Sequence, residues 1–456
     1  MVARESPVSE AGSVTAATGF GRRLSPSERW FWIIDQISPA NCCVRVRVTG
    51  ALSPEQLERG AAAVMAEYPL LRAGVVDPAG GDPRLVALDA ARIPVRRVET
   101  VDPQRWRAEI DAELVEPLEV RAGLARIVDV ASGAGTAEER HDLIVTISHL
   151  IIDGRSLLTV LRKLIEYAVG NGDSHADMVV GRAAVPPSDD LIPVGARGFW
   201  RYVYTTLFDQ AAALVLRPQR LTGAVPLALP ERRTKLVHRV IRAEELAPLV
   251  ADCRRAGVTV HGALAAAVAR AIGHTVRPGG RGVAGIGSPV DFRGELEPVP
   301  DAAELGIYAP VLAGFVRFGP EISLWDMARS VNRQVERGVR QRRHLSTVAG
   351  MRFGTPRTVE SGRRLVELID RRASWNVSVT NVGRVEFPEH IGALRISSLV
   401  LTGSNSCVSA MTVAISTAHD EMQLSFCYVD GVLTARQAED FADHVLGALA
   451  DRPADL

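Results

Sequence analysis

Apolar and polar residues follow two different periods along the chain, and the change from one to the other is clearest in its first half. Leu143–Ile147 is a short apolar run with several β-branched residues, which predicts a buried strand. From Arg155 onward, apolar residues recur every three or four positions, as on one face of an amphipathic helix. His149 and the pair Asp153-Gly154 lie between these two elements. The pattern therefore places a histidine at the end of a strand, and a carboxylate and a glycine where the chain turns into a helix.

The same periods divide the rest of the chain into further elements. Ser25-Pro26 with Glu28, and Ser53-Pro54-Glu55, are typical of helix starts. The patterns predict strands at 42–48, 85–88, 124–130, 283–287, 376–382, 394–401, 409–417 and 422–429. They predict helices at 199–216, 244–255, 259–272, 363–369 and 435–449, and a loop at 353–356. In the strand at 42–48 arginines alternate with apolar residues, so one of its faces is expected to be in water.

The order of these elements predicts an α/β fold built from α+β layers, not a parallel doubly wound sheet. We divide the chain into a disordered tail at 1–22, a first unit at 23–175, a linker with a helix and crossover at 176–235, and a second unit at 236–456. Gly280, Gly282 and Gly285 satisfy the GxGxxG pattern. Because they precede a strand and open no helix, a dinucleotide site is not expected there.

Composition narrows the classes of function. The chain has 456 residues, of which 47% are apolar, and Lys+Arg equals Asp+Glu at 53 each. A net charge of zero gives no indication of a nucleic-acid partner or of a polybasic membrane anchor. Neither a signal peptide nor an 18-residue apolar span is apparent, so a cytoplasmic protein is expected. The five cysteines form no CxxC pair, which favours reduced, buried thiols.

His149 is the main candidate for chemistry, because an imidazole titrates near neutrality and can serve as a general base. A lone histidine after a strand is also a common structural residue, and Asp-Gly is a common turn. Trp30, Phe31 and Trp32 form an aromatic cluster that fits core anchors better than a binding surface. A metal site is not expected, because His141 and His149 lie at opposite ends of one strand.

Ser148–Gly154 resembles the HHxxxDG signature of the chloramphenicol acetyltransferase and condensation-domain superfamily of acyltransferases, except that Ser148 replaces the first histidine. Ser288–Arg293, reading SPVDFR, resembles the PVDLR segment of the mycobacterial phthiocerol dimycocerosyl transferase group. The Tyr68–Arg72 turn resembles a segment of the same superfamily. The resemblance extends over roughly residues 23–450 and is most specific at His149.

The resemblance implies two chloramphenicol acetyltransferase-like subdomains in a pseudo-dimeric V, with an active-site channel between them. It implies that His149 is the base and that Asp153, beside Gly154, pairs with an arginine of the second half. By position that arginine is Arg293, although a solvated loop arginine is the alternative. Asp153 lies four residues beyond His149, so we do not expect it to complete a catalytic triad. Thr380 and Asn381, at the end of a predicted strand, are candidates to stabilise an oxyanion, with Ser148 a further candidate to contact substrate.

These features predict an O-acyltransferase. His149 would deprotonate a hydroxyl of a polyketide or lipid natural product for direct attack on an acyl-CoA or acyl-carrier-protein thioester. No GxSxG elbow occurs, so no acyl-serine is expected, and no cofactor or metal is required. We expect a monomer whose partners are donor, acceptor and, optionally, a carrier protein. An Arg-rich helix at 329–343 fits carrier docking or a solvated face equally well. The alternatives are an amide-forming condensation domain, a non-catalytic carrier-docking protein, and a binding protein that uses the same channel.

Overall fold

The computed structural model describes residues 21–77, 82–170, 179–184, 186–223, 227–404 and 407–451. The elements of the first half are β1 (Gly21–Arg23), α1 (Pro26–Asp35), β2 (Asn41–Thr49), α2 (Pro54–Glu67), β3 (Ala73–Val76), β4 (Arg84–Ala87), β5 (Val95–Glu99), α3 (Arg105–Val115), β6 (Ala125–Ser132), β7 (Arg140–Ser148) and α4 (Gly154–Val169).

The elements of the second half are α5 (Phe199–Leu216), β8 (Arg233–Ile241), α6 (Ala243–Arg255), α7 (Val260–Val276), β9 (Gly282–Pro289), β10 (Val311–Phe318), α8 (Leu324–Arg340), α9 (Arg343–Gly354), α10 (Val359–Arg372), β11 (Val377–Arg384), β12 (His390–Ile391), β13 (Leu394–Gly403), β14 (Met411–Ala418), β15 (Glu421–Asp430) and α11 (Ala435–Ala450). Within the described ranges no single helix is long and apolar enough to cross a membrane. The pair α6 and α7, bent by 100° between them, reaches that length and composition together.

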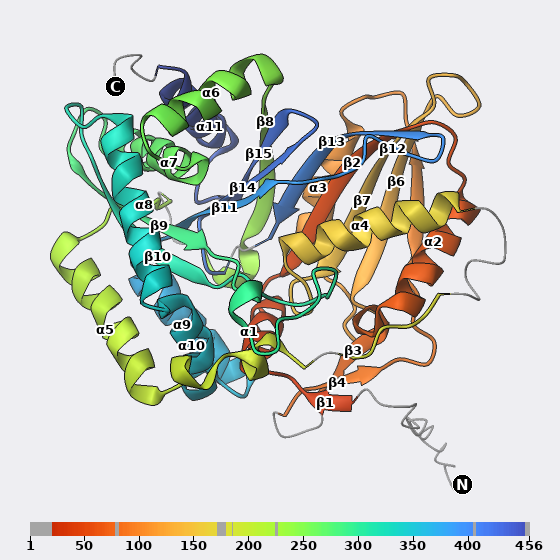
Figure 1. Cartoon of the computed structure of the whole chain (residues 1–456), viewed down its shortest axis with the longest axis horizontal. Helices are drawn as coiled ribbons and strands as arrows, with labels where there is room; N and C mark the ends of the chain where they lie inside the picture. Colours follow the sequence, from red (N-terminus) through yellow and green to blue (C-terminus); the bar gives the residue numbers. More distant parts are fainter. Residues whose placement is uncertain are drawn as a thin grey trace, which may run out of the picture.

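Two six-stranded sheets form the centres of the two halves, and helices pack against both (Figure 1). The first sheet has the strand order β12-β13-β2-β7-β6-β5, and the second has the order β10-β9-β11-β14-β15-β8. A separate small sheet joins β1, β4 and β3. Each large sheet mixes parallel and antiparallel pairs, which confirms the predicted α/β fold of layers.

The second half of the chain supplies strands to both large sheets. β13 pairs antiparallel with β2 of the first sheet. β13 is also hydrogen-bonded to the second sheet, because Ser416 Oγ on β14 donates to the carbonyl oxygen of Leu399 on β13 at 2.7 Å. β12 and β13 lie beyond the predicted boundary at residue 236 in the sequence, but they belong to the sheet of the first half. The two halves are therefore joined through the backbone as well as through side chains.

Helices α1, α2 and α7 begin at or within one residue of the predicted positions, and side chains cap their first turns. Ser25 and Glu28 form a reciprocal capping box at the start of α1, with bonds of 3.2 and 2.8 Å. Ser53 forms the same box with Gln56 at the start of α2, and Thr259 caps α7. Each cap satisfies N–H groups that a helix start leaves without an intrahelical partner.

The expectation of a wet face on β2 is wrong. Arg45 is buried, and both Arg45 and Arg47 pair with Asp142 of the neighbouring β7. The Arg45 guanidinium also lies 4.5 Å above the ring of Trp106 on α3. The sequence patterns did not predict α3, which covers this face of the sheet. Arg45 is buried at an acceptable cost because its charge is paired, and Arg47 is partly exposed.

Three predicted boundaries need correction. Residues 1–20 of the expected tail lie outside the described residues, but Gly21 and Arg22 belong to β1. β8 begins at Arg233, within the segment assigned to the linker, and Gly354 still belongs to α9, which shortens the predicted loop. Parts of the predicted linker, at 171–178, 185 and 224–226, lie outside the described residues.

The GxGxxG glycines serve packing. β9 begins at Gly282, and a Cβ atom on Gly285 would lie 1.9 Å from the backbone oxygen of Ser374. A glycine here lets a neighbouring chain segment approach β9 closely. Gly280 precedes the strand as predicted, whereas Gly282 and Gly285 lie within β9 itself.

Candidate active site

His149 occupies the position where the chain leaves the central strand β7. The N–H of Ser148 donates to the carbonyl of Leu124 at 2.9 Å, and the N–H of His149 donates to the carbonyl of Ala40 at 2.8 Å. The backbone is therefore held from both sides up to the histidine itself. The loop that follows is short and passes directly into α4.

The hydrogen bonding of the His149 ring defines its tautomer. Nδ1 lies 2.8 Å from the carbonyl oxygen of Ile152. Since a carbonyl oxygen only accepts hydrogen bonds, Nδ1 carries the proton and Nε2 keeps a free lone pair. The ring of Phe31 stacks on the imidazole with centroids 4.0 Å apart and planes at 20°. The sequence suggested that the aromatic cluster anchors the core. Trp32 is indeed buried, but Phe31 contacts His149 and therefore belongs to the site.

The surroundings of His149 favour the neutral imidazole. Burial lowers its pKa below the ordinary value of about 6.5, because a charged ring would lose hydration. The nearby Asp153 carboxylate and the Ile152 carbonyl raise the pKa but do not outweigh the burial. At neutral pH the ring is accordingly able to accept a proton at Nε2.

Asp153 binds three donors, and none of them is the imidazole. Its Oδ1 accepts the N–H of Ser156 at 2.9 Å, which caps α4, and it also accepts Nη2 of Arg293 at 2.8 Å. Its Oδ2 accepts the N–H of Tyr308 at 3.0 Å. The structure therefore places Asp153 as a brace between the halves, in line with the expectation that it is no triad member.

Arg293 reaches Asp153 from the turn after β9, and its side chain is 13% exposed. Its Nη2 also donates to Ser156 Oγ at 2.7 Å, and the guanidinium lies 4.2 Å above the ring of Tyr308. Nη1 lies 3.3 Å from Asp291 Oδ2. The alternative of a solvated loop arginine is wrong. Sequence analysis missed Ser156, although its position three residues after Asp153 is typical of an N-cap partner.

Gly154 lies where α4 meets the second half. A Cβ atom there would be 3.0 Å from Leu401 of β13 and 3.4 Å from Val382 of β11. Its backbone has no positive φ, so the turn itself does not require glycine. The absence of a side chain instead lets the first turn of α4 approach β13 and β11.

The weaker candidates occupy different places. Ser148 is buried, and its Oγ accepts the N–H of Leu150 at 3.3 Å. Thr380 and Asn381 lie on β11, and Asn381 Oδ1 accepts the N–H of Gly383 at 2.8 Å. β11 approaches the first half just beyond them, where Arg155 Nη2 donates to the carbonyl of Val382 at 3.3 Å. Within the described residues, no hydrogen bond joins either β11 residue to His149.

The cysteines are poor nucleophiles in this structure. None of the five forms a disulfide, and all five are buried. Burial raises the pKa of Cys43, Cys407 and Cys427 to about 12 and raises that of Cys42 as well. These thiols stay protonated at neutral pH, where only the thiolate attacks efficiently.

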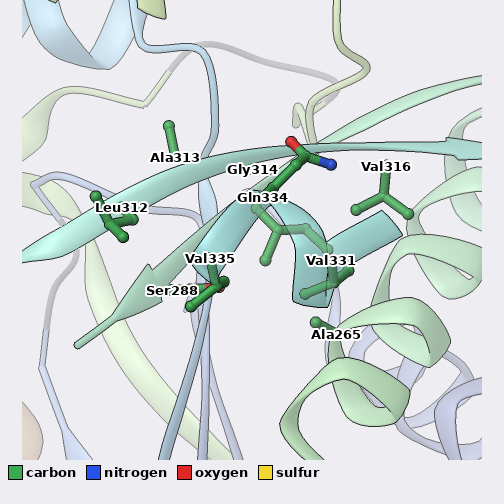
Figure 2. A pocket seen from close by; sticks show the side chains of 10 residues that line it. Ala265, Ser288, Leu312, Ala313, Gly314, Val316, Val331, Gln334 and Val335 are labelled. Carbon is green, nitrogen blue, oxygen red and sulfur yellow. The ribbon is translucent and has the colours of Figure 1, made fainter. Parts of the chain in front are cut away.

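A small cavity of about 10 Å³ lies in the second half and is not lined by His149. It lies between the β9–β10 hairpin and the helices α7 and α8, with Ser288 and Gln334 as its polar members (Figure 2). His261 Nε2 lies 3.0 Å from Ser288 Oγ. Burial lowers the pKa of His261 to about 4, so this second imidazole is neutral too. Over the described residues, no group of three or more His, Cys, Asp or Glu side chains is arranged to hold a metal ion.

Comparison with known proteins shows similarity in sequence over part of the chain and in fold over most of it. Residues 231–434 match the family model described as "Phthiocerol/phthiodiolone dimycocerosyl transferase C-terminus". Polyketide synthase associated protein 5 from Mycobacterium tuberculosis has a similar structure, with a TM-score of 0.68 at 16% identity over 94% of this chain and 97% of that one. Residues 231–434 are therefore similar to that transferase family, and the fold of the chain is similar to that of the polyketide synthase associated protein.

Other proteins extend the likeness. A trichothecene 15-O-acetyltransferase from Fusarium sporotrichioides matches with a TM-score of 0.71 at 13% identity, over 95% of this chain and 96% of that one. The first condensation domain of the CDA synthetase matches with a TM-score of 0.68 at 16% identity, over 96% and 98%. A plipastatin synthase polypeptide from Bacillus subtilis is 27% identical over 150 residues, which cover 31% of this chain and 6% of that protein. The fold is that of a condensation domain, with two chloramphenicol acetyltransferase-like subdomains.

The brace between the halves can be tested by a double-mutant cycle. Asp153→Asn and Arg293→Ala should each lower the free energy of unfolding by about 3–5 kcal/mol, because each leaves a buried partner without its counter-charge. The double variant should cost clearly less than the sum, measured by chemical denaturation. Penalties that simply add would show that the two side chains are not coupled. Arg59→Ala, at an exposed position on α2, provides the control.

Proposed function

We propose that the chain is an O-acyltransferase that moves an acyl group from a CoA or acyl-carrier-protein thioester to a hydroxyl of a polyketide or lipid natural product. The hydrogen bond from His149 Nδ1 to the carbonyl of Ile152 carries the proposal, because it leaves Nε2 free to accept a proton. The family of the C-terminal half indicates transferase activity, and a structurally similar relative is an O-acetyltransferase. The donor, the acceptor and the mechanism are our inference.

The reaction we propose needs one base and no covalent enzyme intermediate. Nε2 of His149 removes the proton from the acceptor hydroxyl. At the same time the hydroxyl oxygen attacks the carbonyl carbon of the thioester. The tetrahedral intermediate then expels the thiolate, and the imidazolium returns the proton to sulfur. The products are an ester and a free thiol, and the histidine ends neutral. The protonated, buried cysteines support this direct route.

The developing oxyanion needs donors placed opposite the base. Thr380 and Asn381 remain our candidates, because β11 approaches the start of α4 at Gly154 and Arg155. We propose that donor and acceptor reach His149 through a channel between the two halves. The chain is proposed to act as a monomer without a bound cofactor or metal. Exposed arginines on α8, such as Arg333, Arg337 and Arg340, would suit an acidic carrier protein.

An amide-forming condensation reaction is the second candidate. The similarity to a condensation domain and to a segment of plipastatin synthase favours it. The same base would then deprotonate an amine instead of an alcohol. Parallel assays with alcohol and amine acceptors, followed by mass spectrometry of the products, distinguish the two. A non-catalytic carrier-docking protein would form neither product.

Replacing the proposed base should abolish transfer. We expect His149→Ala to lower kcat by roughly 10²–10⁴-fold, the usual contribution of a general base, while the thermal midpoint stays near that of the wild type. Ser148→Ala should change kcat only slightly, because its hydroxyl is committed to the Leu150 N–H. A loss in Ser148→Ala as deep as that in His149→Ala would instead identify a serine nucleophile.

The pH dependence should report the environment of His149. Only the neutral imidazole accepts a proton, so kcat/KM should rise with pH through the pKa of His149 and level off above it. Burial lowers that pKa, so the midpoint of the ascending limb should lie below 6.5. A limb with its midpoint at or above 6.5, or a flat profile, would contradict this assignment.

Direct transfer also requires a ternary complex. Initial-rate plots against both substrates should intersect, and intact-protein mass spectrometry should show no acyl-enzyme when the thioester is supplied alone. Parallel plots, or a mass gain equal to the acyl group, would show covalent catalysis. Peptide mapping of that mass would then identify the nucleophile.

A further inference from the structure

Helix α5 carries an apolar stripe that faces away from the protein. The stripe consists of Trp200 (78% exposed), Tyr204 (63%), Leu207 (62%), Leu214 (77%) and Val215 (78%). These positions are separated by four, three, seven and one residues, which places them on one face of a helix with about 3.6 residues per turn. α5 runs along the outer edge of the second half, with α9 on its inner side (Figure 1). Several large apolar side chains exposed on one helix face are unusual unless something binds to them.

The exposed charges on α5 and at its two ends are of one sign. Asp209 is the only acidic residue between positions 197 and 217, and it pairs with Arg343 of α9. Arg201 and Arg217 are exposed near the two ends of the stripe, and neither side chain is paired with another described residue. The face therefore presents apolar side chains flanked by free positive charge.

We propose that the α5 stripe binds the surface of an anionic lipid bilayer, with the helix lying in the plane of the headgroups. Tyrosine and tryptophan favour the boundary between acyl chains and headgroups, and leucine and valine reach below it. Arg201 and Arg217 would each contact lipid phosphates. This inference is independent of the proposed transfer reaction, since α5 supplies no residue to the His149 site.

The charge pattern disfavours a second copy of the chain as the occupant. If two α5 helices paired antiparallel about the middle of the stripe, Arg201 of one copy would face Arg217 of the other. In a parallel pair each arginine would face its own equivalent. The single acidic residue of the helix is already engaged, so no carboxylate on α5 would offset this repulsion. An anionic lipid surface has the charge that both ends require.

The test is flotation of the full chain with vesicles of phosphatidylcholine alone and with added phosphatidylglycerol. The wild type should float with the anionic vesicles, and much less with neutral ones or at high salt. Trp200→Gln with Leu214→Gln should weaken binding at least about tenfold, because two exposed apolar side chains no longer insert. Val101→Gln removes an apolar side chain that is 97% exposed in the first half and should change nothing.

Charge variants test the electrostatic part separately. Arg201→Glu with Arg217→Glu should abolish the preference for anionic vesicles, whereas Arg59→Glu on α2 should keep it. Far-UV circular dichroism of each variant checks that the fold persists. The proposal is overturned if the wild type does not float, or if the α5 variants bind as the wild type does. It is also overturned if sedimentation shows a dimer that Trp200→Gln with Leu214→Gln dissociates, since a second copy would then be the occupant.

Discussion

The ion pair between Asp153 and Arg293 is the interaction on which the geometry of the His149 loop depends. One carboxylate starts α4, binds an arginine from the second half and accepts the N–H of Tyr308. It directly follows Ile152, whose carbonyl holds the His149 ring. The same few atoms therefore join the halves and shape the loop of the proposed base. Such a buried pair need not add net stability, but losing one partner is costly because the other stays charged and buried.

This arrangement separates orientation from chemistry. In a catalytic triad a carboxylate orients the histidine, whereas here a backbone carbonyl does so and leaves the carboxylate to the interface. A carbonyl stabilises an imidazolium less than a charged partner in direct contact would, so the lowered pKa of His149 is consistent with this choice. The stacked ring of Phe31 covers one side of the imidazole and helps to exclude water. A weakly basic, oriented imidazole suits a reaction in which the base must also give its proton back.

Local signals in the sequence were sufficient for most elements and for the core of the site. The capping residues Ser25 and Ser53, and the change of period around His149, depend only on neighbours in the chain. The pairing of Asp153 with Arg293 rested on family resemblance, because 140 residues separate them. No local signal in the sequence indicates that Arg45 is buried, that β13 of the second half joins the first sheet, or that Phe31 contacts His149. Each of these features depends on a contact with a segment that is distant in the sequence, so the residues near it in the chain do not predict it.

Because β13 of the second half pairs with β2 of the first sheet, a change in a single side chain should disturb the site only locally. His149 follows β7, β7 pairs with β2, and β2 pairs with β13. From β13 the Ser416–Leu399 hydrogen bond leads to β14, which pairs with β11 and so with Thr380 and Asn381. The proposed base and the proposed oxyanion donors are thus linked across the two halves by backbone ladders and this one hydrogen bond. We expect a substitution of Asp153 to release the loop that holds His149 and to leave this path intact, because Asp153 takes no part in the strand pairing. Strand pairing therefore fixes the relative positions of β7 and β11, and the ion pair between Asp153 and Arg293 fixes the loop after His149.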